Sequence, residues 1–146
     1  MSLNAGRQCV ETFNHSNIKL SGVRTSVLYI ENAKSRAVKR SELDGCLHPE
    51  GKICDWLVET ADGKEPQIQI FVELKGKKWE EAAVQLEQAL ETYPPNKKGY
   101  RTRCYIVGRS FPAYSTSKQK LESRFQSRYS VPLLTAKDGQ TVGLEK

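Results

Sequence analysis

Residues 53–75 read ICDWLVETADGKEPQIQIFVELK, and this stretch decides the fold. Two runs rich in apolar and β-branched residues, 53–60 and 67–75, flank a tip that contains Asp62-Gly63. An Asp-Gly pair between two such runs is a strong signal for the turn of a β-hairpin. The sequence therefore predicts two adjacent antiparallel strands here.

The register of this hairpin follows from its numbering. With the tip centred near Lys64, opposed residues have numbers that sum to about 128, so Asp55 faces Glu73 with Cβ atoms roughly 5 Å apart. Alternation along the second strand places Glu73 and Lys75 on one face of the sheet. The aliphatic residues take the other face: Ile68, Ile70, Val72 and Leu74. Two acids and a lysine are expected to converge, provided that the register does not slip by one residue.

A helical pattern begins directly after this strand. Apolar residues recur at three- and four-residue spacing over residues 79–93, two acids occupy the first turn, and Pro94-Pro95 marks the stop. Gln85 borders the apolar stripe of this helix. We therefore expect Gln85 to be able to point back toward the end of the acidic strand.

The remaining elements are expected on both sides of this unit. Composition predicts a second hairpin from strands 26–32 and 37–43, joined by a polar link at 33–36. After the first helix we expect a strand at 103–108, an amphipathic helix at 117–129 and a last strand at 131–134. The first 20 residues give no clear element, and the whole chain, residues 1–146, is expected to be one domain.

Charge is divided unevenly along the chain, whose formal net charge is +6. Acids outnumber bases twelve to five over residues 41–91, whereas bases outnumber acids nine to one over residues 97–128. This asymmetry suits a metal site placed beside a surface that binds a polyanion. The alternative is two ordinary solvated faces.

The four cysteines favour a reducing compartment. No signal-peptide pattern and no run of eighteen apolar residues is present, so we expect a cytoplasmic protein with buried thiols and no membrane partner. Cys46, His48 and Cys54 lie close together and are conceivable zinc ligands. A fourth ligand at a recognisable spacing is missing, so buried thiols and a turn histidine are the preferred interpretation.

The convergence of two acids and a lysine favours a divalent cation. Facing carboxylates repel each other and lose hydration energy when they are partly buried, and a bound cation relieves both costs. Mg²⁺ prefers carboxylate oxygens together with water and phosphate oxygens. A lysine beside such a site can orient the attacking water or stabilise charge at phosphorus. The alternative is a set of surface ion pairs, each contributing about 0 to 1 kcal/mol.

At these residues the chain resembles the PD-(D/E)XK, or restriction-endonuclease-like, nuclease superfamily. CDWLVET followed by IFVELKGKKWEEAAVQL is similar to the second and third motifs of that superfamily and to the helix that follows them. The resemblance implies that Asp55, Glu73 and Lys75 are the catalytic acid, acid and lysine. It also implies that the carbonyl of Leu74 is a further metal ligand and that Gln85 matches a glutamine found in some branches.

The resemblance also implies a fold and an activity. The fold would be α/β, with a restriction-endonuclease-like mixed central β-sheet flanked by α-helices in a single domain. The activity would be hydrolysis of phosphodiester bonds in DNA, or in RNA, with Mg²⁺ as cofactor and Mn²⁺ as its substitute. Because one such site cuts one strand, a homodimer is a reasonable expectation. The alternative is a non-catalytic module that binds nucleic acid or protein and retains the nuclease fold.

Two features depart from the superfamily pattern. Cys54 stands where the name of the superfamily places proline, and no N-terminal helix with an acidic residue is recognisable. Asp44 in ELDGCL is a possible additional acid, although Asp-Gly at this point is at least as typical of a turn.

Basic residues in the later third are candidates for binding nucleic acid. They fall in the KKGYR segment and its neighbour and on one face of helix 117–129: Lys97, Lys98, Arg101, Arg103, Lys120, Arg124 and Arg128. Tyr100 is available for stacking on a base. A solvated basic face is the alternative.

Overall fold

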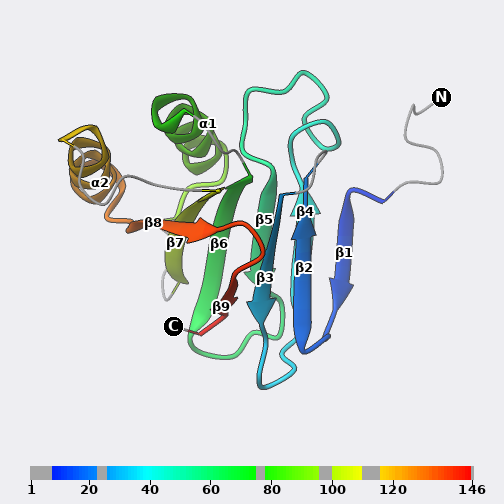
Figure 1. The fold of residues 1–146 in the computed structure, drawn as a ribbon. Helices are drawn as coiled ribbons and strands as arrows, with labels where there is room; N and C mark the ends of the chain where they lie inside the picture. Colours follow the sequence, from blue (N-terminus) through cyan, green and yellow to red (C-terminus); the bar gives the residue numbers. More distant parts are fainter. Residues whose placement is uncertain (1–7, 23–25, 75–77, 96–99, 110–115, 146) are drawn as a thin grey trace.

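The computed structural model describes residues 8–22, 26–74, 78–95, 100–109 and 116–145. Within these residues the chain forms nine strands and two helices (Figure 1). In chain order they are β1 (Val10–Phe13), β2 (Asn17–Ser21), β3 (Val27–Glu31), β4 (Val38–Glu42), β5 (Trp56–Thr60), β6 (Gln67–Leu74), α1 (Trp79–Thr92), β7 (Tyr100–Gly108), α2 (Thr116–Tyr129), β8 (Leu133–Lys137) and β9 (Thr141–Gly143).

The strands of the described residues form two sheets. Six strands make a mixed sheet in the order β1-β4-β5-β6-β7-β8, and three make a smaller sheet in the order β2-β3-β9. In the large sheet β1, β4, β5 and β6 are antiparallel neighbours, and β6, β7 and β8 run parallel. The result is a mixed α/β domain dominated by sheet, as Figure 1 shows.

The large sheet is covered differently on its two faces. One face packs against α1 and α2 in a core that includes Phe71, Leu86 and Phe125. The other face packs against the small sheet in a second core that includes Ile18, Ile30 and Ile70. Within the described residues both helices therefore lie on one side of the large sheet, and the small sheet of β2, β3 and β9 covers the other side (Figure 1).

The structure confirms the hairpin and its register. β5 and β6 pair antiparallel from Trp56 opposite Val72 to Glu59 opposite Gln69, so paired numbers sum to 128 as predicted. Gly63 in the connecting loop has φ +72°, a backbone conformation that glycine adopts without a Cβ clash. The aliphatic residues of β6 join the core beneath the small sheet, whereas Phe71 joins the core beneath the helices.

The second predicted hairpin is wrong in its pairing. Strands form at β3 and β4, close to the expected ranges, but β3 pairs with β2 and β9 and β4 pairs with β1 and β5. The link between them is held by the buried Asn32 side chain, which donates to the carbonyls of His15 and Arg36 and accepts from the Arg36 N–H. This turn carries the chain from one sheet to the other instead of reversing it within one sheet.

Both predicted helices are present, and the termini contain strands that the sequence did not reveal. The N-terminal region forms β1 and β2, the predicted last strand lies slightly later as β8, and β9 follows it. β9 pairs in parallel with β3, so the end of the chain completes the small sheet. Within the described residues, no helix combines the length and the apolar character that crossing a bilayer requires.

Candidate functional site

Asp55 lies immediately before β5, and its atoms contact the residues on both sides of Glu73. Its backbone N–H donates to the Val72 carbonyl at 3.1 Å, and its carboxylate Oδ2 accepts from the Leu74 N–H at 2.7 Å. Because Glu73 lies between those two contacts, the two acids are neighbours at the end of the hairpin opposite its tip. The structure thus places the two predicted acids next to each other along the paired strands.

Glu73 lies near the end of β6 and is 2% exposed. Its neighbours in sequence, Val72 and Leu74, pack in the core beneath the small sheet, so alternation directs Glu73 to the face that the helices cover. A carboxylate buried to this extent is costly unless it contacts a cation or hydrogen-bond donors.

The thiol of Cys54 lies near both acids. Burial raises the pKa of Cys54 well above its ordinary value, and the neighbouring Cys104 and the charges of Glu73 and Asp55 raise it further. Cys54 itself belongs to the core beneath the helices. The charges of both acids therefore act on this thiol.

The other residues of the predicted catalytic set are placed less completely. Lys75 lies outside the described residues. Gln85 is half-buried on α1, next to the buried Leu86. The Leu74 N–H points toward Asp55.

Asp44 occupies a turn, which was the alternative considered from the sequence. Gly45 has φ +81°, and the Cys46 N–H donates to the Leu43 carbonyl across the turn. Asp44 is half-buried, and a Cβ added at Gly51 would lie 3.2 Å from its Oδ1. The turn is tied to the start of β5 because the Leu43 N–H donates to the Asp55 carbonyl.

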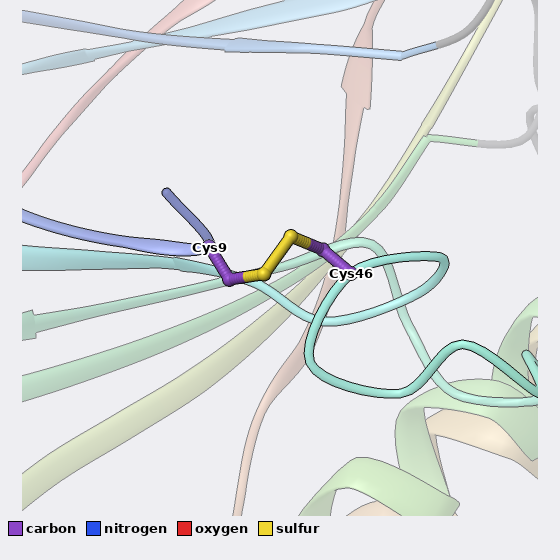
Figure 2. The surroundings of a disulfide bond; sticks show 2 residues. All are labelled: Cys9 and Cys46. Carbon is purple, nitrogen blue, oxygen red and sulfur yellow. A yellow bond between two sulfur atoms is a disulfide. The ribbon is translucent and has the colours of Figure 1, made fainter. Parts of the chain in front are cut away.

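The expectation of buried thiols is confirmed for Cys54 and Cys104 and is wrong for Cys9 and Cys46. Cys9 and Cys46 form a disulfide, shown in Figure 2, while Cys54 and Cys104 are free and buried. Cys46 therefore has no thiolate to offer zinc, and the His48 Nε2 hydrogen-bonds the Tyr93 hydroxyl at 2.8 Å. The sequence holds no local signal for this disulfide because its two cysteines are 37 residues apart and only the fold brings them together.

The disulfide and the His48 contact fix the segment that leads into Asp55. Cys9 directly precedes β1, and Cys46 lies in the loop between β4 and β5 (Figure 2). His48 in the same loop reaches the end of α1 through Tyr93. The loop is thus attached to the edge of the sheet on one side and to a helix on the other.

The predicted nucleic-acid contacts on β7 lie away from the two acids. Arg103 is 6% exposed and donates to the carbonyls of Gly143 and Leu144, so its guanidinium holds the C-terminal segment. Arg101 is exposed but pairs in register with Ile68, near the start of β6, whereas Glu73 pairs with Ile106. Lys97 and Lys98 lie outside the described residues.

The basic face of α2 is partly neutralised by α1. Arg124 forms two hydrogen bonds of 3.0 and 2.9 Å to the Glu87 carboxylate, and Arg128 lies 3.6 Å from the same group. Lys120 is exposed. Arg124 and Arg128 therefore join the two helices, a role that the sequence pattern did not reveal.

Two further observations bear on the site. Among the described residues, no group of three or more His, Cys, Asp and Glu side chains is arranged to hold a metal ion. No family model matches the chain, and neither does any curated protein or solved structure.

Proposed function

We propose that this protein is a Mg²⁺-dependent nuclease that hydrolyses phosphodiester bonds in DNA. The observation that carries the proposal is the position of Asp55, whose N–H and carboxylate contact the residues on either side of the buried Glu73. Carboxylates of two neighbouring acids at one end of a sheet are the oxygen donors that Mg²⁺ prefers in sites that also bind phosphate. The order of elements also supports it: the acidic hairpin is followed by a helix and a parallel strand.

The proposed site assigns a role to each residue of the set. Asp55 and Glu73 would hold Mg²⁺, together with the Leu74 carbonyl, which points to the same side as the Leu74 N–H in an extended strand. Mg²⁺ would neutralise charge that develops on the phosphate during attack by water. Lys75 would orient the attacking water, and Gln85 would support the arrangement from α1.

The test compares cleavage by the wild type and by matched variants. Plasmid, single-stranded and branched DNA are incubated with Mg²⁺, with Mn²⁺ or with a chelator. We expect metal-dependent cleavage by the wild type and a loss of at least about 100-fold in Glu73→Gln and Lys75→Ala. Glu31→Gln, which changes an exposed acid on β3, is the control and should cleave normally.

Two results would contradict the proposal. Cleavage that persists in both Glu73→Gln and Lys75→Ala would come from a contaminating nuclease. Binding of DNA by the wild type without cleavage in any metal would support the alternative, a non-catalytic binding module with this fold. Cutting of both strands of a duplex favours a homodimer, because one site cuts one strand. Sedimentation of the protein with and without DNA would measure its mass and so test whether it is a dimer.

We propose the cytoplasm as the location, because the proposed substrate is nucleic acid. The Cys9–Cys46 disulfide counts against this location, because disulfides are rare in reducing compartments. Rapid alkylation of thiols in intact cells, followed by mass spectrometry, measures whether the bond exists there. A fully oxidised pair would contradict a reducing location.

A further inference from the structure

The proposed site lies at one defined end of the large sheet. β6, β7 and β8 run parallel, and Glu73 pairs with Ile106, which pairs with Thr135, so these three residues form one row across the sheet. This row is close to the carboxyl ends of all three strands. In open sheets with parallel strands, ligands bind outside the carboxyl ends.

Lys137 ends β8 at the same end of the sheet. It lies two residues beyond Thr135, and alternation places both on the same face, the one to which Glu73 belongs. Two strand spacings and two residues of rise separate the Cα positions of Lys137 and Glu73 by about 12 Å. Lys137 is exposed, and within the part of the chain that the structure describes its ammonium forms no ion pair.

Two more lysines stand where the helices begin. Lys78 is the exposed N-cap residue of α1, and Lys118 lies in the first turn of α2. The Lys118 ammonium lies 5.9 Å from the centre of the Trp79 ring, so the starts of the two helices are neighbours. Both helices follow strands that end at this edge, which places these two lysines at the same end of the sheet as Lys137.

Many other cations of the described chain are already neutralised. Lys39 pairs with Glu59, Arg36 pairs with Asp62, and Arg124 and Arg128 share Glu87. Lys118 contacts the Glu122 carboxylate at 3.9 Å and the Trp79 ring. Within the described residues the exposed Lys78 and Lys137 form no ion pair, so their positive charge is available to a polyanion at this end of the sheet.

We propose that Lys78, Lys118 and Lys137 form a phosphate-binding rim that holds the backbone of the DNA strand being cut. The rim comprises these three residues at the carboxyl end of the sheet, and it rests on the proposed nuclease function. Lysines bind phosphates as point charges and read no sequence, so the rim sets where the strand lies and not which bases it carries. The neighbouring phosphates of the strand would lie on the rim while one phosphodiester reaches Asp55 and Glu73.

The experiment measures binding separately from cleavage. Binding of fluorescein-labelled duplex DNA, single-stranded DNA and duplex RNA is followed by anisotropy in Ca²⁺, with NaCl varied from about 50 to 200 mM. The test variant is Lys78→Gln/Lys137→Gln. The control is Lys19→Gln/Lys64→Gln, which removes the same charge from an exposed residue of β2 and from one at the β5–β6 tip.

We expect the rim variant to bind duplex DNA about tenfold more weakly, with the slope of log affinity against log salt reduced by about 2. The control should keep the wild-type slope, and circular dichroism should show both variants folded. Equal losses in rim variant and control, or no loss in either, would overturn the rim. Tighter binding of RNA than of DNA would overturn the choice of DNA as the polyanion.

The outcomes separate the rim from the nuclease. If the wild type cleaves DNA and the rim variant binds it normally, the rim is wrong and the nuclease stands. If the rim variant alone loses binding and no protein cleaves in Mg²⁺ or Mn²⁺, the rim stands and the nuclease is wrong.

Discussion

The Asp55 carboxylate is held in place by the backbone of β6, through the 2.7 Å hydrogen bond from Leu74. Asp55→Asn retains an oxygen for this bond but removes the charge that a cation needs. We therefore expect it to stay folded and to lose binding of Mn²⁺ in calorimetry. Asp138→Asn is the matched control, because Asp138 accepts a 2.7 Å hydrogen bond from the Val27 N–H in the same way. Equal Mn²⁺ binding by wild type and Asp55→Asn would contradict the assignment.

Asp62 gives the stability a dependence on pH. Its two hydrogen bonds from the Arg36 guanidinium lower the pKa of Asp62 from 3.8 to about 2. A pKa that is lower in the folded state stabilises the fold above about pH 4, and this contribution is lost as the pH falls toward 2. Urea midpoints of wild type and Asp62→Asn should therefore differ at pH 6 and converge near pH 2. A constant difference across this range would show that the pair does not titrate as described.

At the scale of elements, the loop between β4 and β5 is attached to the fold by a disulfide. The Cys9–Cys46 disulfide joins this loop to the start of β1, across a separation of 37 residues. A cross-link that closes a loop of this length lowers the entropy of the unfolded chain, and it thereby stabilises the fold by roughly 2–4 kcal/mol. We expect Cys9→Ser/Cys46→Ser to lose that amount in urea denaturation. A reducing agent should destabilise the wild type equally and leave the variant unchanged, whereas a wild type insensitive to reduction would contradict the tie.

The elements that the sequence predicted correctly are those whose signals are local. The β5–β6 hairpin carries its turn, its alternation and its register within about twenty residues, and that register predicts Asp55 beside Glu73. The helices α1 and α2 were equally readable from their apolar spacing. The pairing of β3 with β4 was wrong because β3 pairs with β2 and β9 and β4 pairs with β1 and β5, and β1, β2 and β9 lie where the sequence showed no strand. Sequence adjacency was the only available guide, and the Asn32 turn overrides it.

The parts of the site that were missed depend on contacts between distant residues. Nothing near Arg103 indicates that its guanidinium is buried against the C-terminal segment. The pairing of Arg124 with Glu87 requires two helices to lie side by side. The sequence did not reveal Lys137 as part of the site, because its proximity to the acids arises from parallel strands that are far apart in sequence.

At the scale of the whole molecule, Arg103 joins the two sheets. It belongs to β7 of the large sheet, and it bonds the carbonyls of Gly143 and Leu144 at and just beyond the end of β9. Removing these donors leaves two carbonyls without their partner, which costs about 1–3 kcal/mol each where they are buried. We expect Arg103→Gln to lower the urea midpoint and to bind DNA normally once folded, with Arg101→Gln as control. Normal stability with weakened DNA binding would restore Arg103 as a nucleic-acid contact.

The small sheet also governs when the molecule can finish folding during synthesis. β3 needs β9 as its neighbour, and Val27 bonds Asp138 across 111 residues of chain. Until β9 leaves the ribosome, Ile30 lacks the strand that lies beside it in the small sheet. Nascent chains that stop short of β9 should therefore expose aliphatic surface and attract chaperones, while chains that include β9 can cover that surface.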